Sequence, residues 1–264
     1  MKFDSGYAFG IGAFETISIY KGKPVLFDMH LERLNGTLNF LGINKYIEAR
    51  DVLEFCFAGG EKEDFSLREY CRKPHSFFRD KGVLKLMVSQ ENNIFSVREN
   101  PYDISDMNSA VSLGVPDVIR NETSPFVNHK TFNYGENLFL KKDAVENGLH
   151  DYLFLNSKGN VAETSTGNIF FVREGKLFTP GAEDGILPGV MRRFVLERSE
   201  DIVETEIAFS ELDSFEECFV TNSLTGILPV IRVEGFSFEV GEKTAELKKL
   251  YLNYLEEFDG KNIL

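Results

Sequence analysis

The stretch HKTFNY (129–134) places Lys130 directly before a hydroxyl residue, an aromatic ring, an amide and a phenol. The chain has many other lysines among polar residues, so a solvated surface cation is the ordinary alternative for Lys130. A helical pattern (133–148) follows at once and ends at Gly148. The segments on either side of HKTFNY are needed to decide between a chemical and a surface role.

Composition indicates a folded protein of one large or two small domains. The chain has 264 residues, of which 42% are hydrophobic and 13% aromatic, as expected for a sizeable core. Its net charge of −13 argues against a nucleic-acid surface or an anionic membrane face, although solubility alone would also explain it. An anionic substrate would therefore need a local group of hydrogen-bond donors.

Cysteine and histidine usage gives no metal signature. Cys56, Cys71 and Cys218 are far apart, no C-x-x-C occurs, and the four histidines are scattered, so no metal site is expected. A sparse, odd set of cysteines fits a reducing compartment. The N-terminus lacks a signal-peptide pattern, and no apolar run approaches the ~18 residues of a membrane span. We predict a cytoplasmic protein.

The N-terminal region predicts a hairpin and a helix. GAFETISIY (12–20) alternates apolar and polar types, KGKP (21–24) turns the chain, and VLF (25–27) returns. Asp28 can cap a following helix, in which leucines recur at steps of three and four residues. Gly42 is expected to end this helix.

The middle of the chain contains a candidate domain boundary. Residues 50–80 are expected to be mostly helical, and 82–90 and 109–115 to be strands. The polar segment RENPYDISD (98–106) carries a proline and no periodicity, so we interpret it as a linker, with a plain surface loop as the alternative. This divides the chain into a small N-terminal domain (1–104) and a large domain (105–264).

The C-terminal half reads as a hairpin-rich sheet with interspersed helices. A glycine loop opens a helix within GILPGVMRRFVLE (185–197), and 241–258 is predicted to form an amphipathic helix. Helices and strands mix without regular βαβ alternation, which predicts the α+β class. The expected strands are DYLFL (151–155), VAET (161–164), NIFFV (168–172), LFTP (177–180), ECFVTNS (217–223) and TGILPVIRV (225–233).

Two glycine- or hydroxyl-containing joints are candidate anion sites. In GILPGVMRR (185–193), backbone N–H groups at a helix start could bind phosphate, and a capping turn is the alternative. In FVTNSLTGILPV (219–230), polar residues interrupt a hydrophobic strand, where hydroxyls could hold an anion or simply form a loop. Neither segment is specific alone.

Two charged residues and a glycine pair complete the candidates. VAETSTGNIFF (161–171) places Glu163 beside hydroxyl residues between apolar strands, with an exposed turn as the alternative. HLERL (30–34) carries Arg33 on a helix, where an exposed arginine is the simpler interpretation. FGIGAFET (9–16) contains G-x-G but enters a strand and lacks a third glycine, so it fails as a dinucleotide signature.

In this order, these segments resemble the class IV family of pyridoxal-phosphate enzymes, from about Gly6 to about Val230. The family includes branched-chain and D-amino-acid aminotransferases and 4-amino-4-deoxychorismate lyases. The resemblance rests on the set G-x-G-x-F-E-T, H-L-E-R-L, H-K-T-F-N-Y, E-T-S-T-G-N-I-F, G-I-L-P-G-V-M-R-R and T-N-S…P-V. It implies the two-domain fold type IV and the cofactor pyridoxal 5'-phosphate.

The resemblance implies a role for each candidate. Lys130 would form a covalent imine with the cofactor aldehyde and move a proton. Tyr134 would hydrogen-bond the cofactor phenolate oxygen, and Glu163 would pair with the pyridine nitrogen so that the ring accepts electrons. The phosphate would be held by Arg33, by the N–H groups of Gly189, Val190 and Met191, and by Ser223, while Leu187 would pack on a ring face. Candidate substrate contacts are Phe14, Thr166 and Leu224.

Among family activities, the chain looks most like a 4-amino-4-deoxychorismate lyase, which eliminates pyruvate to give p-aminobenzoate. The alternative is an aminotransferase acting on a branched-chain or D-amino acid with a 2-oxo acid acceptor, and a third is an inactive cofactor-binding relative. Phe14 stands where D-amino-acid aminotransferases place a tyrosine, and no histidine lies near Arg98, which counts against that activity. The family resemblance also implies a homodimer acting on a small amino substrate.

Overall fold

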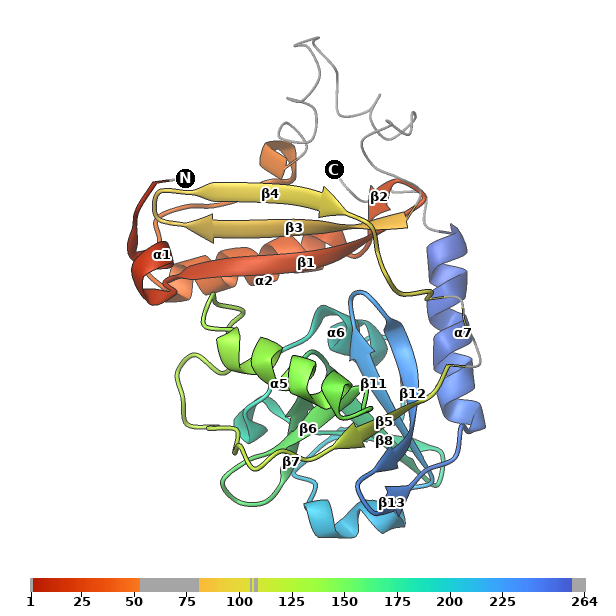
Figure 1. Ribbon diagram of the computed structural model, residues 1–264. Helices are drawn as coiled ribbons and strands as arrows, with labels where there is room; N and C mark the ends of the chain where they lie inside the picture. The colour runs from red at the N-terminus through yellow and green to blue at the C-terminus, as the bar shows by residue number, and fades with distance from the viewer. Residues whose placement is uncertain (1, 53–80, 105, 107–108, 258–264) are drawn as a thin grey trace. The chain divides into compact units, whose positions relative to one another are not determined.

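The computed structural model describes residues 2–52, 81–104, 106 and 109–257 (Figure 1). Within these ranges the chain forms two compact units. Unit 1 comprises the described residues up to Tyr102, the segment Lys130–Asn133 and the end of the described chain from Asn253, and unit 2 comprises the rest. The predicted helical region 50–80 lies outside the described residues beyond residue 52, as do Cys56 and Cys71.

Unit 1 is built on a four-stranded antiparallel sheet with the order β2-β1-β3-β4. Its strands are β1 (Gly12–Tyr20), β2 (Lys23–Pro24), β3 (Lys81–Ser89) and β4 (Asn93–Arg98). The predicted first strand is confirmed, but the return strand is Lys23–Pro24 and not residues 25–27. The reason is that Leu26 takes a left-handed backbone angle (φ 52°), which turns the chain into a helix at Phe27.

The described part of unit 1 includes the helices α1 (Ser5–Phe9) and α2 (Phe27–Phe40). Leucines of α2, including Leu34 and Leu38, are buried in a core shared with β1 and β3. The prediction for Asp28 is wrong, because Leu26 occupies the cap position and Asp28 lies in the first turn of the helix. α2 ends at Phe40, Leu41 is its C-cap, and Gly42 follows with φ 67°, so the predicted end of the helix is confirmed.

Unit 2 contains a larger mixed sheet with the order β10-β9-β8-β11-β12-β5-β6-β7, and β13 pairs with β12. The strands are β5 (Val111–Gly114), β6 (Asp151–Leu155), β7 (Val161–Thr164), β8 (Asn168–Arg173), β9 (Lys176–Thr179), β10 (Ile202–Glu204), β11 (Glu217–Asn222), β12 (Gly226–Val233) and β13 (Phe236–Ser237). The predicted strands of this half are confirmed. Two short ones, β10 and β13, were not predicted.

The helices of the second half are α5 (Gly135–Glu146), α6 (Val190–Leu196) and α7 (Glu242–Glu257), with 3-10 turns η1 (Ala182–Asp184) and η2 (Phe209–Ser214). Each predicted helix is confirmed within a few residues. The inner faces of β8, β11 and β12 supply a core rich in phenylalanine and β-branched residues. Together the two units form the mixed α+β architecture that the sequence predicts.

Candidate functional site

The segment that carries Lys130 pairs with the start of β1 in unit 1. The backbone N–H of Phe14 donates to the carbonyl of Lys130 at 3.0 Å, and the N–H of Phe132 donates to the carbonyl of Gly12 at 2.8 Å. A side chain at Gly12 would collide with the ring of Phe132, and one at Gly10 would collide with Asn133. The glycine pair near the N-terminus is therefore required for this docking, in addition to forming a turn.

Two lysines contact the ring of Phe14. The Nζ of Lys85 lies 3.7 Å and the Nζ of Lys130 lies 4.5 Å from the ring centroid. Lys85 faces Thr16 across β1 and β3, and its ammonium donates to the Thr16 hydroxyl at 3.0 Å. Burial lowers the pKa of Lys85 to about 8. No role was predicted for Lys85, although a lysine within the apolar strand pattern at 82–90 indicates a partly buried cation.

Arg33 lies in a buried ion cluster of unit 1. Glu15 shares a strand face with the core residues Ala13 and Ile17, so its carboxylate is fully buried. Arg33 donates from Nε and Nη2 to the two carboxylate oxygens at 2.8 and 2.7 Å, and His30 Nδ1 lies 2.8 Å from Oε2. The predicted exposed alternative for Arg33 does not apply.

The charges of this cluster compensate one another. Burial alone would raise the pKa of the Glu15 carboxyl, but Arg33 and His30 outweigh it and hold that pKa well below its usual range. Burial also lowers the pKa of His30, against the opposing effect of Glu15. The guanidinium of Arg33, in the middle of α2, is thus held in place by the ionised Glu15.

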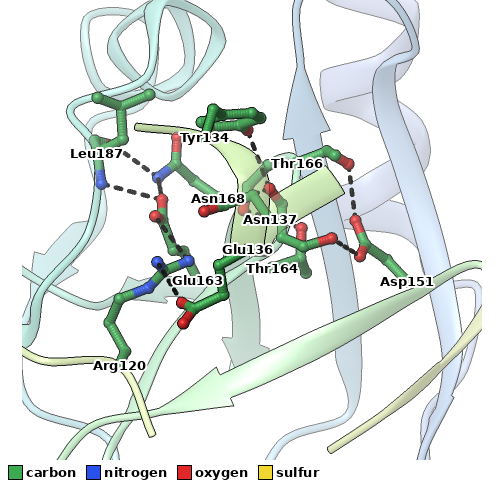
Figure 2. Close-up of polar contacts among 12 residues, drawn as sticks. Arg120, Tyr134, Glu136, Asn137, Asp151, Glu163, Thr164, Thr166, Asn168 and Leu187 are labelled. Atoms are coloured by element: carbon green, nitrogen blue, oxygen red, sulfur yellow. Dashed lines mark hydrogen bonds and ion pairs between the residues drawn. The ribbon is translucent and has the colours of Figure 1, made fainter. Parts of the chain in front are cut away.

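Glu163 forms the centre of a second cluster, in unit 2 (Figure 2). Its Oε2 accepts hydrogen bonds from the backbone N–H of Leu187 at 2.9 Å and from the Asn168 side chain at 3.2 Å. Asn168 also donates to the carbonyl of Leu187 at 2.8 Å, which ties β8 to the loop before α6. A buried carboxylate held by such donors can exchange a proton with a bound base.

Arg120 approaches the other oxygen of this carboxylate. Its Nη2 lies 3.6 Å from Glu163 Oε1, and its Nη1 lies 3.9 Å from Glu136 on α5. The guanidinium stacks 3.9 Å from the ring centroid of Phe154. Neither Arg120 nor Asn168 was given a role from sequence. Asn168 lies in a quoted motif, whereas Arg120 sits in a polar segment without periodicity.

The turn after Glu163 is fixed by buried polar contacts. The hydroxyl of Tyr134 donates to the carbonyl of Ser165 at 2.9 Å, and Asn137 donates to the same oxygen at 2.8 Å. Asp151 accepts from the hydroxyl of Ser165 and, at 2.7 Å, from that of Thr166. These contacts order the hydroxyl-rich turn, which is not the exposed loop that the simpler interpretation expected.

Most of the remaining predicted residues lie in two loop regions of unit 2, at the start of α6 and between β11 and β12. A side chain at Gly189, the cap of α6, would collide with the Asn168 amide, and Val190 and Met191 form the buried first residues of that helix. In the joint between β11 and β12, the N–H groups of Leu224 and Thr225 donate to the Asn222 side chain at 2.9 Å. The half-buried Ser223 lies in the same joint.

Two negative findings apply to the part of the chain that the structure describes. No group of three or more His, Cys, Asp or Glu side chains there could hold a metal ion. No helix in the same ranges combines the length and apolar character needed to cross a membrane.

A comparison of the sequence with protein-family models identifies the family to which the chain belongs. The family model described as amino-transferase class IV matches residues 12–233, which is most of the chain. The chain belongs to the class IV aminotransferase family. The matched region contains both clusters described above, and the resemblance inferred from the sequence motifs is confirmed.

Individual relatives point to two activities within this family. The chain is 27% identical over 263 residues to an aminodeoxychorismate lyase of Bacillus subtilis, covering 94% of this chain and 87% of that protein. It is also 27% identical over 267 residues to a probable branched-chain-amino-acid aminotransferase of Aquifex aeolicus, with 94% and 85% covered. A crystal structure of a putative 4-amino-4-deoxychorismate lyase from Legionella pneumophila superposes with a TM-score of 0.77 at 26% identity, covering 97% and 95% of the two chains.

Proposed function

We propose that this protein is a pyridoxal-phosphate-dependent 4-amino-4-deoxychorismate lyase, which releases pyruvate and forms p-aminobenzoate. The observation that carries the proposal is the nearly full-length likeness to the Bacillus subtilis aminodeoxychorismate lyase. The fold of the Legionella pneumophila structure supports it, because that likeness also extends over almost the whole chain. Family membership alone fits both a lyase and an aminotransferase.

The Glu163 carboxylate of unit 2 fits the protonated nitrogen of a pyridine ring. Glu163 is buried, and hydrogen bonds from Leu187 and Asn168 fix its carboxylate, so it suits a ring N–H as partner. When bound, the cofactor supplies an electron sink for the negative charge left by proton removal. The roles of Leu187 beside the ring and of Gly189, Val190, Met191 and Ser223 at the phosphate stay predictions.

Lys130 and Arg33 of unit 1 fit two further requirements of the cofactor, which are covalent attachment of its aldehyde and binding of its phosphate. Lys130 provides the primary amine for covalent attachment and then the base that takes a proton from the substrate. Its Nζ lies 4.5 Å from the centroid of the Phe14 ring, which places the amine against the first strand of unit 1. Arg33 is held in place by Glu15 and is the predicted phosphate cation.

Tyr134 requires a change of hydrogen bond to act as predicted. Its hydroxyl hydrogen is now donated to the carbonyl of Ser165. A phenol has one hydrogen, so donation to a cofactor phenolate oxygen requires this hydrogen to rotate away from Ser165. The Asn137 amide donates to the same carbonyl and would keep that oxygen hydrogen-bonded after the rotation.

The second candidate function is a branched-chain aminotransferase, which the Aquifex aeolicus relative supports. The test supplies 4-amino-4-deoxychorismate to purified protein with added cofactor and measures p-aminobenzoate and pyruvate. A parallel reaction supplies L-leucine or D-alanine with 2-oxoglutarate and measures glutamate. We expect p-aminobenzoate with wild type and none with Lys130→Ala. Robust transamination without p-aminobenzoate would contradict the lyase proposal, and neither product would indicate an inactive relative.

Three further properties stay predictions. The family resemblance implies a homodimer, which light scattering on the purified protein would test. Cytoplasmic localisation follows from the sparse cysteines and is tested by cell fractionation. Phe14, Thr166 and Leu224 are proposed to contact the substrate, and a crystal structure with a substrate analogue would test them.

A further inference from the structure

Arg120 is held rigidly in unit 2 by contacts on several sides. Its backbone N–H donates to the carbonyl of Leu155 at 2.8 Å, and it forms an isolated bridge with Asn156. Its guanidinium lies 3.9 Å from the ring centroid of the fully buried Phe154. A side chain at Gly185 would approach the Arg120 Cγ to 3.1 Å. The sheet and its loops therefore fix both the backbone and the stem of this arginine.

The contacts of the Arg120 head group are incomplete. Within the described residues, its Nε and Nη2 are buried and make no hydrogen bond. Nη2 nevertheless lies 3.6 Å from Glu163 Oε1, which is beyond hydrogen-bond length but within the range of a strong charge interaction. An arginine held this way contributes mainly its charge to Glu163, whereas Leu187 and Asn168 supply the directed hydrogen bonds.

We propose that Arg120 is a positioning residue that keeps Glu163 ionised and thereby keeps the ring nitrogen of the bound cofactor protonated; this rests on the proposed function. A proton between Glu163 and the ring nitrogen can lie on either atom. A cation beside the carboxylate favours the form with a charged carboxylate and a protonated ring, because it is nearer to the carboxylate than to a ring on its far side. Without that cation, the neutral pair of carboxylic acid and pyridine gains population.

The proposal distinguishes Arg120 from an arginine that only stabilises the fold. Arg192 is a suitable control, since it is also buried in unit 2 and pairs with a glutamate, Glu204, at 2.6 Å. It donates to the carbonyl of Pro180 at 2.8 Å, and within the described part of the chain its hydrogen bonds and ion pairs do not involve Glu163. Loss of either arginine should reduce stability, but only the loss of Arg120 should change the protonation of the ring.

The test reads the ring nitrogen directly. Protein is loaded with pyridoxal 5'-phosphate carrying ¹⁵N in its ring, and the ¹⁵N resonance is measured by NMR at one pH. We expect a pyridinium resonance in wild type and Arg192→Met, a shift toward neutral pyridine in Arg120→Met and Glu163→Gln, and a largely retained pyridinium resonance in Arg120→Lys. In the Glu163→Gln background, Arg120→Met should cause no further shift.

The outcomes separate this inference from the proposed function. If wild type binds the labelled cofactor and Arg120→Met keeps the wild-type resonance, the role of Arg120 is overturned while the proposed function stands. If wild type does not bind the cofactor, both are overturned. Should Arg120→Met not fold, Arg120→Gln replaces it, because glutamine keeps an N–H donor without the charge, and a wild-type resonance in that variant would equally overturn the inference.

Discussion

Glu15 in unit 1 and Glu163 in unit 2 are both buried, and both lie beside an arginine, but their partners differ. Glu15 is bound at contact distance by two nitrogens of Arg33 and by His30. Glu163 accepts its directed hydrogen bonds from the neutral groups of Leu187 and Asn168, with Arg120 more distant at 3.6 Å. The comparison separates a carboxylate that holds a cation in place from one that can share a proton.

The difference has a physical basis in proton affinity. A carboxylate in contact with a bidentate arginine resists protonation, and accordingly the pKa of Glu15 is held well below its usual range. Such a group is suited to positioning Arg33 but not to acid–base chemistry. In the inference above, the more distant Arg120 keeps Glu163 ionised, and its carboxylate can then accept a hydrogen bond from a ring N–H.

The largest expected effect comes from breaking the cluster of unit 1. Glu15→Gln leaves Arg33 and His30 without their buried counter-charge, and we expect the free energy of unfolding to fall by about 3–5 kcal/mol. Urea unfolding at pH 7 measures it. The matched control is Glu256→Gln, which removes an exposed partner of Lys21 and should lower the free energy of unfolding far less, because solvent screens that pair. Equal effects of the two substitutions would show that Glu15 is not the anchor of this cluster.

Glu163→Gln should impair turnover far more than stability. Glutamine retains an oxygen for the Leu187 N–H but cannot hold a proton on the ring, so we expect kcat to fall by about 100-fold or more. The measurement is p-aminobenzoate formation at saturating cofactor. Glu136→Gln is the control, because Glu136 is a largely exposed carboxylate beside the same Arg120, and it should stay within a few-fold of wild type. A Glu163→Gln enzyme of normal kcat would remove the distinction between the two glutamates.

Lys85 extends the comparison to buried cations. Its pKa is lowered by burial from its ordinary 10.5 to about 8, so the folded protein holds fewer protons than the unfolded chain between these values. Stability therefore rises with pH across that window, and below it the charged lysine carries a constant penalty. Lys85→Met should raise the free energy of unfolding by about 1–2 kcal/mol at pH 7, after allowance for its partial exposure and the lost Thr16 contact.

The gain from Lys85→Met should be largely lost near pH 10.5, where the wild-type lysine is neutral in the folded protein and half neutral in the unfolded chain. Unfolding curves at pH 7 and pH 10.5 check this. Lys81→Met is the control, since Lys81 is an exposed lysine on the same strand. A gain that is independent of pH would mean that the lysine charge is not its cause.

A smaller effect is expected from His150 in unit 2. Burial, and next the neighbouring Lys141, lower its pKa to about 4 from 6.5. The unfolded chain then binds more protons as pH falls from 6.5 to 4, so stability is lost on acidification in that window. His150→Gln should flatten this part of the stability–pH curve by about 1–2 kcal/mol. An unchanged curve in the variant would assign the acid sensitivity to other groups.

The sequence correctly predicted those helices and strands whose spacing of apolar residues matches the faces that are buried in the structure. β1 alternates apolar and polar types, and α2 carries leucines at helical spacing, so both follow from local pattern. β4 was missed because its burial is confined largely to Phe95, and its other residues read as a polar loop. The second strand of the N-terminal hairpin was predicted at the wrong residues because Leu26 takes a left-handed backbone angle. Leucine rarely adopts this conformation, so the sequence does not indicate it.

Pairings between distant residues account for what could not be predicted in the site. Glu15 appears in sequence as one member of a strand, and its bond to Arg33 depends on α2 packing over that strand face. Likewise, nothing near Arg120 in the chain indicates Glu163, more than 40 residues later, as its partner. Motif order located the candidate residues, whereas the roles of Arg120, Asn168 and Lys85 required three-dimensional contacts.

The most direct test of the central claim asks which lysine binds the cofactor. Lys85 and Lys130 both contact the Phe14 ring, and Lys85 has a pKa low enough to supply a reactive amine. Protein incubated with pyridoxal 5'-phosphate is reduced with borohydride, digested and analysed by mass spectrometry. We predict one modified site, Lys130, and its loss in Lys130→Ala. Modification of Lys85 in place of Lys130, or of many surface lysines to equal extents, would contradict the account.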